Sequence, residues 1–310
     1  MASGKADAND QRDAPLSGIT RMTPANLPAS IRARLRNLAE RERVDFGAIL
    51  TRYALERMLY RISIGEHQDE FLLKGALLFD VWFDTPSRPT RDIDLLGFGS
   101  ADAERIADVF RTACSLEVHD GITFDPITVA TTDIRKVAGY PGIRATMRSD
   151  LDGAQIHVQV DIGFGDAVTP GPILVTFPVL LDDMAPPILQ GYPKATVIAE
   201  KLEAIVQLGR INSRLKDYFD LWILLSSTDT NLSDVSPAIS ATFTRRGTAI
   251  PLTTPVGLSR EYAEDPRVVA QWRAFVTRNQ LSAPSLVDVI SQLREIVIQS
   301  SPRRVMPSSS

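Results

Sequence analysis

Residues 71–96, which read FLLKGALLFDVWFDTPSRPTRDIDLL, decide the fold. The segment opens with the apolar run Phe71-Leu72-Leu73 and continues through Lys74-Gly75-Ala76 into apolar residues at helical spacing. It ends in Asp92-Ile93-Asp94-Leu95-Leu96, where polar and apolar residues alternate. Alternation with a period of two is typical of a strand, and a glycine between apolar runs is typical of a turn. The segment therefore predicts a strand, a glycine turn, a helix and a second strand.

On that second strand, Asp92 and Asp94 share one face while their aliphatic neighbours point to the core. Two unit charges ~4 Å apart at a dielectric of about 20 repel by roughly 4 kcal/mol, a sizeable part of a domain's stability, so a cation is the expected neutraliser. Oxygen ligands favour a hard cation such as Mg²⁺ or Mn²⁺, which one or two carboxylates hold together with substrate phosphates. Taken alone, the same motif could simply cap a turn or pair with Arg88 and Arg91.

A third carboxylate follows on another strand with the same alternation. Residues 156–162 read IHVQVDI, so His157, Gln159 and Asp161 share the polar face. If this strand neighbours the first, Asp161 joins Asp92 and Asp94 as a metal ligand or as a proton acceptor. Such a triad could hold two metal ions ~3.5 to 4 Å apart, as in phosphoryl and nucleotidyl transfer.

The turn Lys74-Gly75-Ala76 is the candidate phosphate site. Free backbone N–H groups at the start of a helix favour a phosphate, and glycine lets the backbone approach it closely. A glycine turn, then Asp-x-Asp, then a third aspartate is the order of a nucleotidyltransferase.

Composition limits the class of protein. The chain has 310 residues, a formal net charge of -4 and a single cysteine, Cys114, which excludes an internal disulfide and favours the cytoplasm. No apolar stretch approaches the ~18 to 20 residues needed to cross a bilayer, so we expect no membrane insertion. The net charge excludes a wholly basic nucleic-acid coat and leaves room for a local basic patch. One candidate patch is residues 31–61, with eight arginines against four acidic residues, which predicts either an ion-paired helix surface or an RNA-phosphate footprint.

The patterns along the chain predict an α+β fold, in which a small mixed β-sheet is preceded by N-terminal helices and followed by a C-terminal helical domain. Strands are expected at 92–96, 127–130, 142–147 and 155–163, the last two joined by a turn at Asp152-Gly153. The prolines between 170 and 193 predict an irregular crossing between subdomains. The predicted parts are a disordered tail (1–20), an N-terminal helical region (21–70), a nucleotidyltransferase core (71–192), a C-terminal helical domain (193–301) and a second disordered tail (302–310).

These residues also carry a family resemblance. The run Phe71 to Leu96 resembles the signature of the AbiEii/MenT-type nucleotidyltransferases, which are members of the DNA polymerase β-like superfamily. Three later blocks resemble that family in the same order: Asp161 to Asp166, Ala199 to Ile205 and Arg214 to Leu221. The resemblance covers about residues 25 to 300, and four ordered blocks are far more specific than any one of them.

The resemblance implies roles for residues of the later blocks. Lys201 would grip the phosphates of the incoming nucleotide, and Asp217 or Asp220 would be the acidic residue that the family needs for activity. From the residues alone, Lys201 would be a solvated lysine and Asp217 and Asp220 members of a surface ion pair. Ala76 departs from the family, which often has Gly or Ser there. Together, the expected catalytic residues are Asp92, Asp94, Asp161, Lys201 and Asp217; the expected nucleotide-binding residues are Lys74, Gly75, Ala76, Lys201 and Asp220; and the expected metal ligands are Asp92, Asp94 and Asp161.

The implied activity is metal-dependent transfer of a nucleotide from an NTP to a nucleic-acid acceptor, with the tRNA 3' end as the implied acceptor. The resemblance further implies a toxin of a toxin-antitoxin or abortive-infection system, restrained by an antitoxin encoded by an adjacent gene. Two alternatives stay open: a nucleotidyltransferase that modifies a protein or small-molecule hydroxyl, and a non-catalytic nucleotide-binding module. The fold and the site chemistry rest on the residues, whereas the acceptor rests on the resemblance.

Overall fold

A seven-stranded mixed sheet with the strand order β3-β4-β5-β2-β1-β7-β6 organises the protein. The structure is a computed structural model that describes residues 26–83, 90–135 and 141–300. The strands are β1 (Phe71–Lys74), β2 (Asp92–Gly97), β3 (Thr123–Arg135), β4 (Pro141–Leu151), β5 (Ala154–Phe164), β6 (Ile173–Thr176) and β7 (Ile188–Gly191). The α-helices are α1 (Leu27–Glu42), α2 (Phe46–Ile64), α3 (Leu77–Trp82), α4 (Ala103–Ser115), α5 (Lys194–Leu208), α6 (Leu215–Ser226), α7 (Leu232–Arg246), α8 (Arg260–Glu264), α9 (Pro266–Arg278) and α10 (Leu286–Ser300). The α+β prediction is confirmed, although the sheet is larger than expected.

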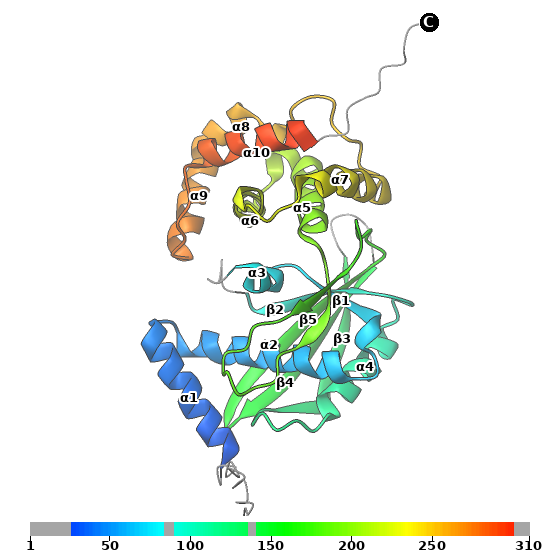
Figure 1. Cartoon of the computed structure of the whole chain (residues 1–310), viewed down its shortest axis with the longest axis vertical. Coiled ribbons are helices and arrows are strands. Elements are labelled where there is room, and N and C mark those ends of the chain that lie inside the picture. Colours follow the sequence, from blue (N-terminus) through cyan, green and yellow to red (C-terminus); the bar gives the residue numbers. More distant parts are fainter. Residues whose placement is uncertain (1–25, 84–89, 136–140, 301–310) are drawn as a thin grey trace, which may run out of the picture.

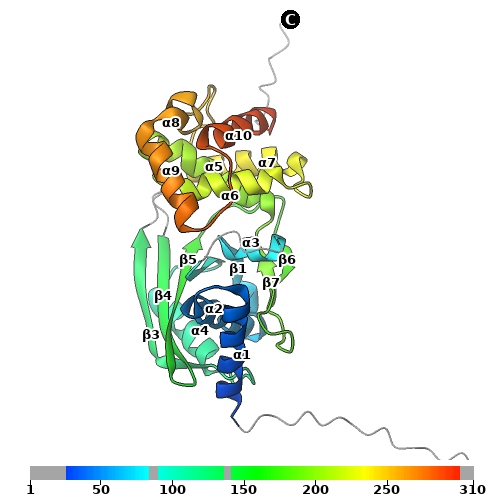
Figure 2. The ribbon, with the colours of Figure 1, turned by 90° about the vertical axis from the view of Figure 1, so that its left-hand side faces the viewer.

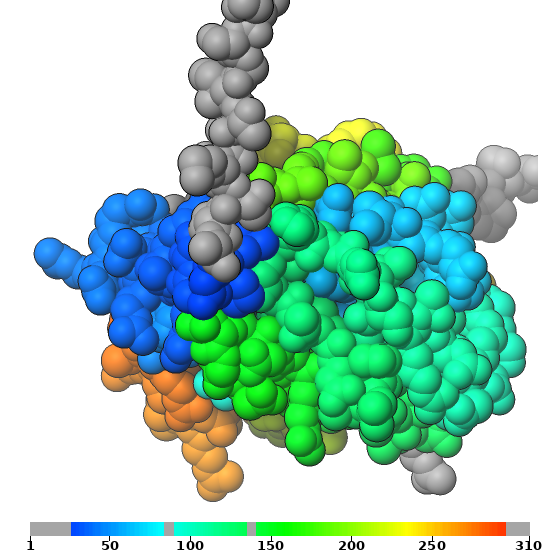
Figure 3. Space-filling model, turned by 90° about the horizontal axis from the view of Figure 1, so that it is seen from below, coloured from blue at the N-terminus to red at the C-terminus, as the bar shows by residue number. Residues whose placement is uncertain are grey.

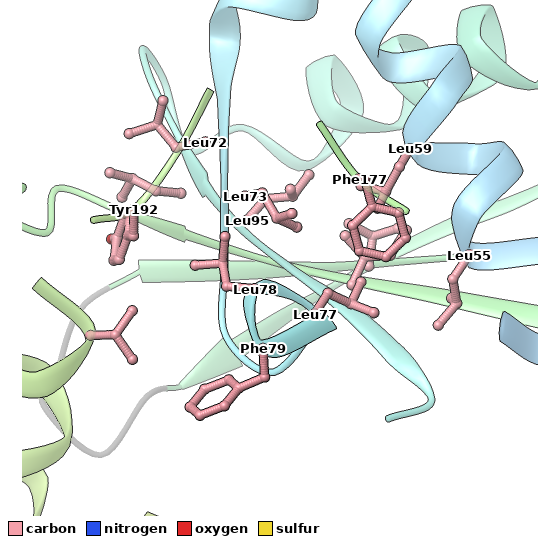
Figure 4. Packing of buried hydrophobic residues seen from close by; sticks show 14 of the residues in the cluster. Leu55, Leu59, Leu72, Leu73, Leu77, Leu78, Phe79, Leu95, Phe177 and Tyr192 are labelled. Carbon is pink, nitrogen blue, oxygen red and sulfur yellow. The ribbon is translucent and has the colours of Figure 1, made fainter. Parts of the chain in front are cut away.

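The helices and the sheet form two tiers. Helices α1, α2 and α4 accompany the lower part of the sheet, and helices α5 to α10 gather beyond its upper end (Figures 1 and 2). Seen from below, the blue residues of the N-terminal helices adjoin the green residues of the strands (Figure 3). Side chains from β1, β2, α2 and α3, among them Leu73, Leu95, Leu59 and Leu77, gather in one apolar core (Figure 4).

The predicted order strand, glycine turn, helix and strand is present as β1, the turn at 75–76, α3 and β2. Strand β2 pairs antiparallel with β1 and parallel with β5, so Asp94 lies opposite Lys74 on one side and opposite Asp161 on the other. Along β5 the even-numbered residues Val158, Val160 and Ile162 are buried. The odd-numbered positions, including Asp161, therefore project from the opposite face, as the alternation predicted.

Strands β4 and β5 form the predicted hairpin. Asp152 and Gly153 both have positive φ, 51° and 78°, which is the conformation that the Asp-Gly dipeptide favours. The two-residue turn sets Leu151 opposite Ala154, and this register continues to Arg144 opposite Asp161.

The proline-rich segment is more regular than expected. Instead of an irregular crossing, residues 170–193 contain β6 and β7, which pair with each other and extend the sheet from β1. Both strands have only four residues and β6 lies at the sheet edge, where proline-flanked strands are tolerated.

Among the C-terminal helices, α7 was not predicted, and it contains Pro237 in its interior. The helix nevertheless begins with Asn231 as N-cap and ends at Gly247, which has a φ of 65°. The tails predicted at 1–20 and 302–310 lie outside the described residues. None of the helices within the described residues is long and apolar enough to span a membrane.

The arginines of α1 and α2 are mostly engaged in internal ion pairs. Arg57 and Arg61 are buried and both donate to the buried carboxylate of Asp120. Arg52 pairs with Asp80 at 2.9 Å and lies over the ring of Phe177. Two others pair at the surface, Arg32 with Asp152 and Arg34 with Asp183. The ion-paired interpretation of residues 31–61 therefore holds, partly as buried pairs, and these five arginines are unsuited to an RNA-phosphate footprint.

Candidate active site

The glycine turn lies directly on the second carboxylate of the Asp-x-Asp motif. Gly75 has a φ of +74°, and a Cβ at this position would collide with Oδ2 of Asp94 and lie only 2.7 Å from its Cγ. Only glycine meets both constraints, the positive φ and the close approach. The following helix, α3, has six residues, so any phosphate at this turn would depend on the turn's own N–H groups more than on a helix dipole.

The three aspartates project from one face of two adjacent parallel strands. Asp94 lies opposite Asp161, and Asp92 lies opposite Gln159. The hydroxyl of Thr90 donates to Oδ1 of Asp92 at 3.0 Å. The sheet thus brings the predicted carboxylates into neighbouring positions.

Arg144, which the sequence prediction missed, occupies the third carboxylate. Its Nε and Nη2 donate to Oδ1 and Oδ2 of Asp161, each at 2.8 Å. The hydrogen bonds to Asp161 and the negative charges of Asp161, Asp92 and Asp94 raise the pKa of the Arg144 guanidinium, against a smaller effect of burial. Arg144 is therefore the cation that now balances this carboxylate-rich face.

Within the described ranges, no three acidic, histidine or cysteine side chains lie close enough together to hold a metal ion. Asp161 is held by Arg144, and the neighbouring carboxylates of Asp92 and Asp94 offer oxygens that could bind a divalent cation. Two carboxylates are a sufficient protein contribution for Mg²⁺ when substrate phosphates supply further ligands. The donor set fits such an ion, and Arg144 competes with it for the oxygens of Asp161.

Lys201 is held in place by two buried carboxylates from the next helix. Its Nζ lies 3.0 Å from Oδ1 of Asp217 and 2.7 Å from Oδ2 of Asp220, and both aspartates are fully buried. Arg214 pairs with the other oxygen of Asp217 at 2.7 Å. Because α6 presents Asp217 and Asp220 to α5 rather than to solvent, the surface ion-pair interpretation of these two residues is wrong. Both carboxylates contact Lys201, but only Asp217 lines the pocket that is described below.

A second charged cluster surrounds Lys74. Its Nζ lies 2.8 Å from Oδ2 of Asp166 and 3.7 Å from Oε1 of Glu200. Burial alone would lower the pKa of Lys74, but Glu200, Tyr192 and Asp166 outweigh burial and raise it. Burial would likewise raise the pKa of Asp166, but Lys74 and Arg246 outweigh it and hold this pKa below its ordinary value. Lys74 is thus charged and already partnered.

Arg246 completes this cluster from the end of α7. Its Nη2 lies 3.1 Å from Asp166 and 3.0 Å from Glu200, and its Nη1 lies 2.8 Å from Glu203. The Arg246 side chain is only 13% exposed and is held by three carboxylates. Only the tertiary arrangement brings it to this site, so the local sequence held no signal for its partners.

These elements enclose a pocket of about 330 Å³ between the sheet and α5 to α7. The predicted site residues that line it are Lys74, Gly75, Ala76, Asp94, Lys201 and Asp217. Three others lie outside its lining, namely Asp92, Asp161 and Asp220. Asp92 instead lines a neighbouring groove together with Gln159 and His157.

Comparison with solved structures finds distant likenesses. The structure of JHP933 from Helicobacter pylori is 14% identical, with a TM-score of 0.48, and the match covers 82% of this chain and 91% of that one. A putative nucleotidyltransferase from H. pylori is 14% identical with a TM-score of 0.46, covering 82% and 94%. An antigenic nucleotidyltransferase-like protein from Paracoccidioides brasiliensis is 13% identical with a TM-score of 0.29, covering 87% and 94%. At these scores the likenesses carry no argument about function.

No curated protein matches the chain at a significant level. The sequence does match, over residues 57–295, the family described as "Nucleotidyl transferase AbiEii toxin, Type IV TA system". That match spans most of the chain and includes β1, the Asp-x-Asp strand, β5 and the helices α5 to α9. The chain therefore belongs to the AbiEii nucleotidyltransferase toxin family.

Proposed function

We propose that this protein transfers a nucleotide from an NTP to an RNA acceptor, specifically the 3' end of tRNA, in a reaction that needs Mg²⁺ or Mn²⁺. It would act in the cytoplasm as a toxin that an antitoxin encoded by an adjacent gene restrains. The observation that carries this proposal is the pocket in which the glycine turn lies against Asp94 and faces Lys201. Family membership supports the nucleotidyltransferase chemistry, and the RNA acceptor is our inference.

Each part of the pocket has a task in this reaction. The N–H groups of the Gly75-Ala76 turn and the ammonium of Lys201 would hold the triphosphate from two sides. Asp217 and Asp220 fix the position of that ammonium through two hydrogen bonds. Pre-positioning of this kind supplies much of the rate acceleration in phosphoryl transfer.

Asp92 and Asp94 would hold the divalent cation. When bound, the cation would neutralise the triphosphate and favour deprotonation of the acceptor hydroxyl. Asp161 would serve as a further ligand or as the proton acceptor, and Arg144 competes with either role for its oxygens. Arg144 thereby prevents three carboxylates from facing one another uncompensated while the nucleotide is absent.

The test is a transfer assay with purified protein, Mg²⁺, total tRNA and each labelled NTP in turn. We expect label on RNA with the unaltered protein and none with Asp94→Asn or Lys201→Gln. Asp183→Asn, which alters a surface ion pair between α1 and the segment that joins β6 to β7, is the matched control and should label RNA normally. Label on a protein band alone would refute the RNA acceptor, and label retained by Asp94→Asn would refute the catalytic assignment.

A further inference from the structure

A second groove, of about 490 Å³, adjoins the nucleotide pocket and is lined by residues at the start of α6 and along α9. Arg214 and Lys216 line both the groove and the pocket, so the two share a wall. Helix α9 runs from α8 toward the level of α3 and lies beside α6 (Figures 1 and 2). The lower end of α9 therefore lies near the level of α3, the helix that follows the glycine turn of the pocket.

The lining of this groove has one sign of charge. It includes Arg214, Lys216 and Arg278 and no carboxylate. Asp217 lies buried beneath Arg214 and offsets part of its charge. Helix α9 as a whole, PRVVAQWRAFVTR, carries three arginines and no acidic residue, in a chain whose net charge is -4.

The rest of the groove suits bases and their polar edges. Phe275 contributes a half-buried ring that packs against Trp272 and edge-on to Phe219. Gln271 and Asn279 add polar side chains to the same lining. Cations that track a backbone together with an aromatic surface are the combination that binds single-stranded nucleic acid.

The acceptor also needs such an exit from the pocket. Its terminal hydroxyl must reach the triphosphate, and the nucleotides before it must leave the pocket past phosphate-binding groups. At the wall formed by Asp166, Glu200 and Glu203, the three carboxylates outnumber their two cationic partners, Lys74 and Arg246. At the wall shared with the groove, Arg214 and Lys216 outnumber Asp217. Five arginines of α1 and α2 are already engaged in ion pairs with carboxylates of this chain and offer no alternative track.

We propose that the α6–α9 groove binds the single-stranded 3' segment of the RNA acceptor through Arg278, Lys216 and Arg214. This inference rests on the proposed function, because it places the acceptor of that reaction. It adds a binding surface beyond Asp92, Asp94, Asp161 and Lys201, and that surface shares Arg214 and Lys216 with the pocket wall.

The test measures RNA binding without catalysis. The probe is a single-stranded RNA of about eight nucleotides, labelled with fluorescein at its 5' end, and its affinity is followed by fluorescence anisotropy from low to moderate salt. Arg278→Glu should weaken binding at least fivefold and reduce the salt slope by about 0.7 for each phosphate that the variant no longer neutralises. Arg273→Glu is the matched control, because it makes the same charge change on the same helix at an exposed residue outside the groove. It should stay within twofold of the unaltered protein, and circular dichroism must show both variants folded.

The alternatives give distinct results. Equal weakening by Arg278→Glu and Arg273→Glu would mean a diffuse positive field and would overturn the groove. Arg148 is an exposed residue of β4 on the face that carries Arg144. Weakening by Arg148→Glu but not by Arg278→Glu would overturn the groove in favour of that face of the sheet. RNA affinity unchanged by Arg278→Glu, with loss of binding to poly-aspartate, would assign the groove to an acidic protein instead.

The outcome also separates this inference from the proposed function. If RNA binds through Arg278 but no nucleotide is transferred, the groove stands and the proposed function fails. If transfer occurs and Arg278→Glu leaves the KM for RNA unchanged, the proposed function stands and the groove fails. The expected result is a raised KM for RNA with an unchanged KM for NTP.

Discussion

Asp120→Asn tests whether the arginines of α2 are part of the scaffold. The Asp120 carboxylate is about 1% exposed and accepts hydrogen bonds from Arg57 at 3.1 Å and from Arg61 at 2.7 and 3.2 Å. Both guanidiniums are themselves buried, and Arg61 also donates to the carbonyl of Ile122. The substitution removes the negative charge from this cluster while keeping its shape.

Breaking a buried ion pair by removing one partner costs about 3–5 kcal/mol, because it leaves an uncompensated buried charge. Asparagine keeps one acceptor oxygen, so we expect the lower end, about 3 kcal/mol. At about 2–4 °C per kcal/mol for chains of this size, the Tm should fall by about 6–12 °C. The loss is a large part of the ~5–15 kcal/mol that holds most domains folded.

The measurement is a pair of urea and thermal unfolding curves at pH 7, with Asp183→Asn beside Asp120→Asn. Asp183 pairs with Arg34 at the surface, where both side chains are 39% exposed. An exposed pair contributes about 0–1 kcal/mol, so this control should barely move. Equal shifts in the two variants would refute the scaffold assignment, as would a loss of RNA affinity in folded Asp120→Asn.

Three further predictions concern the site itself. Gly75→Ala should lower the transfer rate at least about a hundredfold, because its Cβ would displace the Asp94 carboxylate. Gly153→Ala is the control and should leave the rate intact, because Gly153 also has positive φ but nothing lies within 4 Å of an added Cβ. Similar rates in both variants would contradict the packing argument. Asp166→Asn should destabilise the protein by at least about 1.5 kcal/mol at pH 7. The pKa of Asp166 is lower in the folded than in the unfolded protein, where it is about 3.9, so its contribution to stability is present above that value and is lost as pH falls through the folded pKa. The difference in free energy of unfolding between the two proteins should therefore shrink toward acid pH. A difference that stays constant down to pH 3 would rule this out. Arg144→Met should tighten Mn²⁺ binding in a calorimetric titration. The gain should be no more than about fivefold, because the Arg144 side chain is 39% exposed. Weaker binding would show that Arg144 does not compete with the metal for Asp161.

Hydrophobic alternation predicted the central part of this site. It placed Asp92 and Asp94 on one face of β2 and Asp161 on the matching face of β5, and the parallel pairing of the two strands brings them together. The glycine turn was predicted for phosphate approach. The structure adds a second reason for glycine, the contact between Gly75 and Asp94.

The pairing of Arg144 with Asp161 was also within reach of the sequence. A two-residue turn at Asp152-Gly153 fixes every opposite pair in the hairpin, and counting back from it sets residue 144 against residue 161. The alternation in β4 then puts the guanidinium on the carboxylate face. Extending the turn argument along the whole hairpin would have found it.

Other features depended on contacts that no local pattern encodes. The arginines of α2 look like a basic surface until Asp120, far along the chain, is placed among them. Helix α7, which contains Pro237, was not predicted, and with it the sequence prediction missed the element that delivers Arg246. The partners of Arg246 come from α5 and from the segment after β5, so only tertiary packing reveals them.

The charge balance of the pocket leads to a last prediction, on how the nucleotide must bind. The pocket is lined by five cationic side chains and by five carboxylates. Lys74, Lys201, Arg214 and Arg246 each already contact at least one carboxylate. A triphosphate brings several further negative charges close to Asp94, and cations that are already paired with carboxylates cannot offset them fully.

The nucleotide must therefore arrive with its own countercharge. We expect NTP affinity to fall at least tenfold, about 1.4 kcal/mol, when EDTA replaces Mg²⁺ in an anisotropy titration with a fluorescent NTP. Asp94→Asn should lose most of this Mg²⁺ dependence, whereas Asp183→Asn should retain it. Equal affinity in Mg²⁺ and EDTA would mean that the pocket cations suffice, and would overturn the assignment of Asp92 and Asp94 to a metal that accompanies the nucleotide.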